Sequence, residues 1–361
     1  MKKLLLGTSA LVAVGLCASE ASAQGYASLQ GFMRNYGSIF DHGSTTAASA
    51  RDIQFTMNSE FFVRGETKLN NGLIYGFRME MEAWTQNSST SAQGVDNVDE
   101  VWAYVKGSFG EIRFGEEDDA RKLKAYSTYI GGAALFFGVD SPDGVYALGT
   151  SSTYFNIEND TNKIIYLSPS FGGFSFAVSY APDATKGTRS FGIQFDNDCD
   201  GTQGRFCNGN AWSVAADYRG KFGDTTIGVD AGYSSSDHET AGRNSVTAWR
   251  ADAFLQVAGW EASIQYGKAN DINGNDLDVS AMGGAIKYSM GPWSVGGFYQ
   301  QGRTDVAGGG RNKINHFLVG AGYNLGGGVS LGGALSYQKR DNATGADPTA
   351  TTVTFGIGAN F

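Results

Sequence analysis

The acidic and basic side chains of this sequence could act on charged or polar solutes, and they gather in two places. One long polar connection carries acids at its start and in its middle: Glu116, Glu117, Asp118, Asp119, Asp140 and Asp143. Alternating segments before it carry basic residues: Arg34, Arg64, Arg78, Lys106 and Arg113. If the fold brings the two sets face to face across a narrow passage, the resulting transverse field orders water and disfavours apolar solutes. Alternatively, some of these charges pair with neighbours on the same wall.

Catalytic chemistry is not predicted. A hydrolase would need a positioned histidine beside a serine or a carboxylate. The three histidines, His42, His238 and His316, lie in no catalytic motif, and the sequence contains no zinc-protease motif, nucleophile elbow or CxxC pair. The acidic balance does not favour nucleic-acid binding either, because residues 24–361 contain 25 basic and 35 acidic residues.

The elements that must position these charges are short segments with period-two alternation, which predicts strands. Glycine-bearing turns and longer polar loops alternate between them, and glycine supplies the positive φ of tight hairpins. We predict sixteen antiparallel strands and an all-β fold. The predicted strands are 26–36, 52–68, 73–85, 100–106, 111–115, 163–168, 174–181, 212–220, 225–233, 247–257, 260–268, 279–289, 293–302, 315–324, 329–338 and 352–361.

One face of each predicted strand can be written without a charge, and the other face holds the ionised residues. A soluble sandwich and a transmembrane barrel both fit this alternation. The even strand count, the aromatic residues at the ends of the apolar faces and the terminal Phe361 favour the barrel. Sixteen strands also enclose a lumen too wide for side chains to fill. The sequence therefore predicts a transmembrane β-barrel with short turns at one end and long loops at the other.

The first 23 residues have the pattern of a secretory signal peptide, which leaves residues 24–361 as the barrel. Lys2 and Lys3 are followed by an apolar run and by the small residues Ala21, Ser22 and Ala23. The apolar run is too short for a membrane-spanning helix, which needs about 20 residues.

The segment from Tyr104 to Gly115 and the terminal Phe361 resemble the general porins of Gram-negative outer membranes, most closely those of alphaproteobacteria. The resemblance implies an outer-membrane homotrimer that contacts lipid and lipopolysaccharide, with short periplasmic turns, long extracellular loops and a third loop folded into the pore. It also implies passive diffusion of small hydrophilic solutes and ions. A substrate-specific channel of the same fold, with a site among Trp84, Trp102, Tyr104 and the arginines, is the alternative.

The third long connection fits the inward position on its own residues. Its middle, 129–139, is too apolar to lie in water. We predict that it packs on the inner wall and presents its acids to the pore, which favours a weak preference for cations. A buried plug, or a patch that covers a neighbouring subunit, is the alternative.

Methionines on the outward face of the first three strands suggest where subunits meet. Met33, Met57, Met79 and Met81 all fall on this face, whereas later strands carry tryptophan and tyrosine there. Methionine adapts to irregular protein surfaces, and aromatic belts address lipid headgroups. We predict that these four residues contact another subunit, with lipid contact as the alternative.

The fourth long loop carries two further predictions. Cys199 and Cys207 remain in an exported chain and are predicted to form a disulfide. Asp196, Asp198 and Asp200 match the front of a calcium loop, in which alternate oxygens converge on a hard cation. The twelfth position of that motif is Cys207 rather than glutamate, so an acidic loop held by the disulfide, without calcium, is the alternative.

Overall fold

The fold is described from a computed structural model. It describes residues 25–41, 52–84, 98–126, 153–155, 157–158, 160–184, 208–240, 242–272 and 277–361. The predicted signal peptide, the disulfide cysteines, the aspartates of the fourth loop, Asp140 and Asp143 lie outside these residues, and so does His42.

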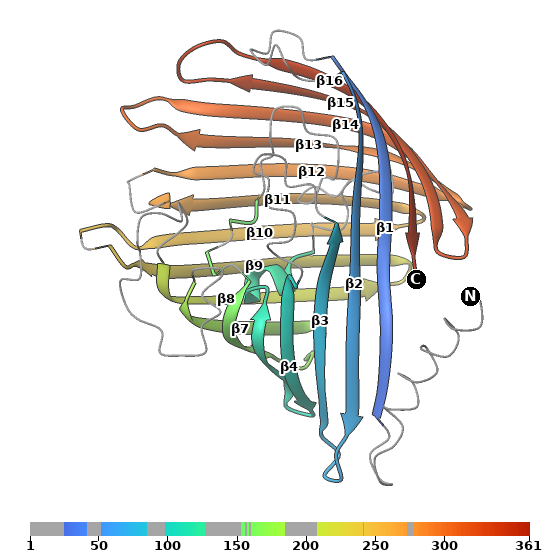
Figure 1. The fold of residues 1–361 in the computed structure, drawn as a ribbon, viewed down its shortest axis with the longest axis vertical. Helices are drawn as coiled ribbons and strands as arrows, with labels where there is room; N and C mark the ends of the chain where they lie inside the picture. Colours follow the sequence, from blue (N-terminus) through green and yellow to red (C-terminus); the bar gives the residue numbers. More distant parts are fainter. Residues whose placement is uncertain are drawn as a thin grey trace, which may run out of the picture.

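Sixteen antiparallel strands form one closed barrel in which each strand pairs with its neighbours in the chain and β1 pairs with β16 (Figure 1). Both predictions, the all-β class and the sixteen-stranded barrel, are confirmed. One short helix, α2, follows β5. The elements are β1 (Gly25–Asp41), β2 (Ile53–Lys68), β3 (Ile74–Trp84), β4 (Glu100–Gly107), β5 (Gly110–Glu117), α2 (Ala120–Lys124), β6 (Thr161–Leu167), β7 (Phe174–Asp183), β8 (Asn208–Phe222), β9 (Thr225–His238), β10 (Val246–Val257), β11 (Trp260–Asn270), β12 (Val279–Met290), β13 (Trp293–Asp305), β14 (Arg311–Gly326), β15 (Val329–Asp341) and β16 (Thr349–Asn360).

The predicted strand ends were wrong in places because the ladder continues into polar sequence. β1 runs to Asp41, five residues past its predicted end, and pairs with β16 over this extension. β5 includes Glu116 and Glu117, which were predicted to open the third connection. They pair with Asn162 and Thr161 of β6, so the third connection begins at Asp118, two residues later than predicted.

The tight turns use the positive φ that the glycines allow. Ala258 and Gly259 join β10 to β11 with φ of 50° and 83°, a pair of left-handed residues suited to a two-residue hairpin. β16 closes the barrel by pairing with β1, and Phe361, the residue after β16, exchanges two backbone hydrogen bonds of 2.8 and 3.0 Å with Gly31.

The apolar side chains point outward and the charged ones inward, as the alternation predicted. Phe55 is 77% exposed and Ile264 67% exposed on the outer face. Aromatic rings pair along two levels of this face, for example Trp249 with Tyr266 near the loop ends and Trp293 with Tyr323 near the turns. Rings at two levels match the two interfaces of a bilayer.

No helix within the described part of the chain has the length and apolar character needed to cross a membrane.

Candidate functional site

The third connection leaves β5 and turns onto the inner wall. Its first described stretch, residues 118–126, contains α2, which contacts β6, β7, β8 and β9. The backbone N–H of Ala120 donates to the hydroxyls of Ser179 and Ser213, 3.1 Å from each. The described start of this connection is therefore fixed to the wall, which confirms the predicted inward fold.

A buried ion pair fixes α2. Asp119 caps the helix, and one carboxylate oxygen accepts from the backbone N–H groups of Arg121 and Lys122 at 2.8 and 3.0 Å. The other oxygen accepts from the Arg121 guanidinium at 2.7 and 3.1 Å. Asp119 is 0% and Arg121 1% exposed. Burial alone would raise the pKa of Asp119, but the guanidinium holds it below its usual value, so the carboxylate stays ionised.

The same arginine joins the two arms of the connection. Arg121 also donates to the carbonyl oxygen of Phe155 at 2.7 Å, and its guanidinium carbon lies 5.1 Å from the ring centroid of Tyr154. Because Phe155 precedes β6 and Arg121 follows β5, one side chain links the outgoing and the returning segments.

The returning arm packs on the wall beside α2. Ile157 is buried against Val246 and Ala248 of β10 and Ala269 of β11. Glu158 is fully buried and accepts from the Ser179 hydroxyl at 3.0 Å, and burial raises the pKa of this carboxyl to about 7. Both described arms therefore lie against the inner surface.

Two inward-facing glycines make room for these arms. A Cβ on Gly232 of β9 would lie 2.7 Å from Cγ of Arg121, and a Cβ on Gly267 of β11 would lie 2.1 Å from the carbonyl oxygen of Thr153. Any side chain at either position would push the connection away from the wall. Sequence reasoning missed both residues, although a glycine on the lumenal face of a strand is a usable signal for close backbone approach.

Carboxylates of β8 and β9 hold the end of the outgoing segment. The backbone N–H of Tyr126 donates to Asp230 at 2.9 Å, and its hydroxyl donates to Asp217. Lys124 forms an ion pair with Asp217 at 3.1 Å. Burial, together with the hydrogen bond to Asp217, raises the pKa of Tyr126. These wall acids thus attach the connection and are not free to attract solutes.

The predicted basic residues lie on the inner face of β1 to β5, beside carboxylates of the same wall. Arg64 and Lys106 both contact Glu66, at 2.5 and 3.0 Å, and Arg78 pairs with Glu80. Arg113 contacts Glu111 at 2.6 Å and Glu117 at 3.0 Å. Arg34 lies over the ring of Phe32 at 4.2 Å. Arg64, Arg78, Lys106 and Arg113 thus each have a carboxylate partner on the wall itself.

The predicted acids separate into different environments. Glu116 is 8% exposed, at the end of β5 where three successive residues are buried, so its carboxylate is not open to the pore. Asp119 is buried at the start of α2 and presents no charge to open water. For these two acids the predicted exposure to the pore was wrong. Glu117 lies beside Arg113, and Asp118 forms an ion pair with Lys122 at 2.6 Å.

The aromatic residues considered for a solute-specific site are covered. Trp102 is 8% exposed and Tyr104 is 3% exposed. The Arg113 guanidinium carbon lies 4.2 Å from the ring centroid of Trp102, and that of Arg64 lies 5.8 Å from the ring of Tyr104. These rings support arginines and offer no open stacking face. The side chain of Trp84 lies outside the described residues.

The four methionines lie at outward positions. Met33 and Met57 are 43% and 38% exposed, and Met79 and Met81 pair with Val63 and Phe61 on the outer face of β2. Their outward placement agrees with the alternation, and their contact with another subunit remains a prediction.

A family model described as Gram-negative porin matches residues 7–343, which is most of the chain. The chain belongs to this porin family. A porin is an outer-membrane diffusion channel, and the sixteen strands of this porin are the part that crosses the membrane.

Individual relatives agree with this assignment. The porin is 24% identical to a monosaccharide porin of Halomonas sp over 397 positions, covering 98% of this chain and 100% of the relative. It is 27% identical to outer membrane porin protein 32 of Delftia acidovorans over 187 residues, 51% of this chain and about half (50%) of that relative's length. A trimer form of OmpT of Vibrio cholerae has the same fold, with a TM-score of 0.59 at 15% identity, covering 93% and 99% of the two chains. The alphaproteobacterial subtype remains a prediction.

Proposed function

We propose that this porin is a non-catalytic channel for passive diffusion of small hydrophilic solutes and ions. The observation that carries the proposal is the inward position of the ionised side chains along β1 to β5, together with a third connection fixed on the wall. A water-filled lumen is the environment in which so many ionised groups are stable at the depth of a bilayer.

The local ion pairs favour weak ion selectivity. Arg64, Lys106 and Arg113 each have a carboxylate oxygen 2.5 to 3.0 Å away, so the opposite charges largely cancel at a distance. Salt screens the remaining field beyond a Debye length of about 8 Å. The surplus of acidic residues in the sequence gives the remaining preference its sign, towards cations. Selectivity of this kind is graded and does not depend on one binding site.

Conductance in a planar bilayer tests the channel directly. The purified protein is expected to produce discrete steps that close in groups of three, with a small reversal potential of cation-selective sign under a salt gradient. Current that saturates with one sugar or amino acid would favour the substrate-specific alternative. A protein that inserts but conducts nothing would contradict the proposal and favour a blocked, structural barrel.

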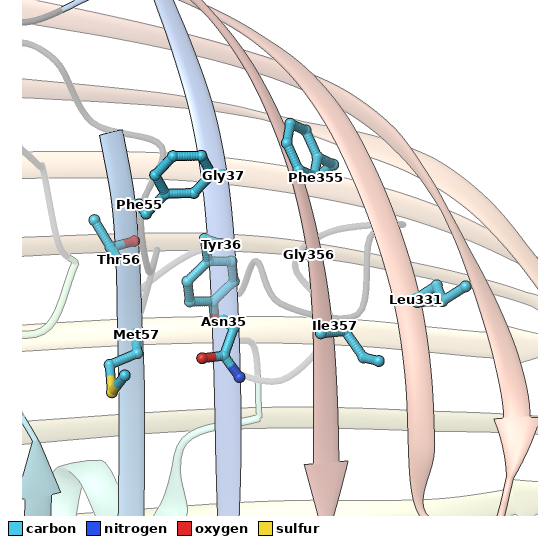
Figure 2. Close-up of a pocket in the computed structure, with 10 residues that line it drawn as sticks. All are labelled: Asn35, Tyr36, Gly37, Phe55, Thr56, Met57, Leu331, Phe355, Gly356 and Ile357. Atoms are coloured by element: carbon cyan, nitrogen blue, oxygen red, sulfur yellow. The ribbon is translucent and has the colours of Figure 1, made fainter. Parts of the chain in front are cut away.

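We also propose that the porin is a homotrimer whose subunits meet at the wall of β1 to β3 and β16. An apolar groove of about 680 Å³ crosses this wall between β2 and β15 (Figure 2). Figure 2 shows Phe55 and Met57 on one side and Phe355, Ile357 and Leu331 on the other, with Gly37 between them. Asn35 lines the same groove, and an amide on the outer face of a barrel is better satisfied by protein than by acyl chains.

The trimer is expected to dissociate when arginine replaces Met57 and Met81. Two guanidinium groups at a packed apolar interface would be buried without partners, which costs more than the interface gains. Native gels and light scattering measure the outcome. Met282→Arg is the matched control, because Met282 lies on the outer face of β12 and is 40% exposed. An intact trimer in the double variant would assign the four methionines to lipid contact.

Outside that wall, we infer that lipid and lipopolysaccharide surround the barrel. The paired rings of Trp212 with Tyr233 and Trp260 with Tyr288 lie at the two ends of the apolar face. Such amphipathic rings suit the headgroup regions. The disulfide between Cys199 and Cys207 and calcium binding at Asp196, Asp198 and Asp200 remain predictions.

A further inference from the structure

Three carboxylates converge where the third connection leaves and rejoins the wall. Glu100 begins β4, Asp118 follows β5 and Asp160 precedes β6. One ligand oxygen from each residue lies within 4.8 Å of those from the other two.

Strand register brings these residues together. Val101 pairs with Glu116, and Glu117 pairs with Thr161, so Asp118 and Asp160 lie one step beyond the last pair of β5 and β6. Glu100 precedes Val101 on β4, which puts it opposite Glu117, one step before Asp118. The cluster therefore joins both ends of the connection to a third strand, although its members are far apart in sequence.

Glu100 is the observation that points to a ligand. The residue is 6% exposed, and its carboxylate forms no hydrogen bond or ion pair with any residue that the structure describes. The groups that act most strongly on it are the acids Asp118, Glu117 and Glu80. A buried ionised carboxylate is stable only with a counter-charge, so this side chain lacks a partner that its position requires.

Lys122 is a cation beside this cluster. Its ammonium lies 2.6 Å from Asp118. Burial nevertheless raises the pKa of Asp118 to about 6, against the influence of Lys122. A proton is therefore the competing occupant.

We propose that Glu100, Asp118 and Asp160 bind a divalent cation of the calcium class. Calcium takes six to eight oxygen ligands in flexible geometry, so three carboxylates can be completed by backbone carbonyls and water. The absence of histidine and thiolate from this ligand set disfavours zinc and copper. Bound there, the cation ties both ends of the third connection to β4, next to the pairs of Arg113 and Arg78. The site does not depend on whether the channel conducts.

Calorimetric titration of the intact, EDTA-stripped oligomer with calcium chloride tests the site. Glu100→Gln and Asp160→Asn should each weaken one class of sites, one per protomer, by about tenfold or more, because each removes a charged oxygen ligand. Glu261→Gln is the matched control, since this inner-wall carboxylate is paired with Lys287 at 2.8 Å, and it should leave the titration unchanged. A triple variant, Asp196→Asn, Asp198→Asn and Asp200→Asn, tests the fourth loop separately. It should still bind calcium at Glu100, Asp118 and Asp160.

Terbium luminescence excited through tryptophan provides a second measurement, because Trp102 lies two residues from Glu100 on the same strand face. The signal should fall in both cluster variants, and calcium should displace it in the unmodified protein. Calcium binding at wild-type strength in Glu100→Gln and Asp160→Asn overturns the proposal, as does loss of binding in the triple variant alone. Absence of calcium binding at millimolar concentration also overturns the proposal. If a pH titration then shows a group that releases a proton near neutral pH, a shared proton occupies the cluster instead. If Glu100→Gln does not fold, Asp160→Asn decides by the same criteria.

Discussion

Replacing Asp119 with alanine is expected to destabilise the porin by about 3–5 kcal/mol, the cost of leaving a buried charge without its partner. Arg121 would remain 1% exposed and would lose the carboxylate oxygen that lies 2.7 Å from its guanidinium. The substitution also removes the cap of α2, and with it the acceptor for two backbone N–H groups. The attachment of both arms of the third connection then weakens together, because the guanidinium that contacts Phe155 loses its fixed orientation.

Unfolding free energies in urea measure this effect, and single-channel recordings should show larger, noisier currents as the connection leaves the wall. Arg311→Ala is the control, because it breaks an exposed pair with Asp305 and should cost no more than about 1 kcal/mol. Asp119→Asn retains a capping oxygen, so its loss of unfolding free energy should lie between those of Asp119→Ala and Arg311→Ala. Equal stability of Asp119→Ala and Arg311→Ala would show that the buried pair does not hold the connection.

The barrel could be predicted because its strands obey a rule that is local in sequence. A strand between lipid and water must alternate, so each strand shows its two faces within about ten residues. β11 reads Trp260, Ala262, Ile264 and Tyr266 on one face whatever its neighbours are. Strand ends were less certain, because residues such as Asp41 and Glu117 extend the ladder through backbone pairing that side-chain pattern does not encode.

The site was predicted only in outline because its partners depend on register. The inward fold of the third connection followed from its apolar middle, but nothing in the sequence distinguishes Asp119 as a buried cap from Asp118 beside it. Some wall pairs were readable: residues i and i+2 share a strand face, which joins Arg64 to Glu66 and Arg113 to Glu111. The contact of Lys106 with Glu66 crosses from β4 to β2, and no sequence spacing reveals it.

Arginine in place of Ile264 is expected to cost about 2–4 kcal/mol, the penalty for a guanidinium on the lipid face near mid-bilayer. Ile264 is 67% exposed in the middle of β11, between Ala253 and Gly284 of the adjoining strands. Small neighbours leave room for the new side chain, so a steric clash does not explain the loss. Urea unfolding of the protein in lipid vesicles measures the difference.

The control for this prediction is Ser330→Arg, a charge added to the inner face of β15 beside Asn324 and Gly358. Ser330 is half-buried and faces the lumen, where water solvates the guanidinium, so the change should be within about 0.5 kcal/mol, the range of surface substitutions. The contrast between the two variants separates lipid from water directly. If the outer face met water, Ile264→Arg would be as harmless as the control, since an exposed isoleucine of a soluble protein tolerates a charge. A cost confined to Ile264→Arg therefore requires hydrocarbon outside the barrel and water within it.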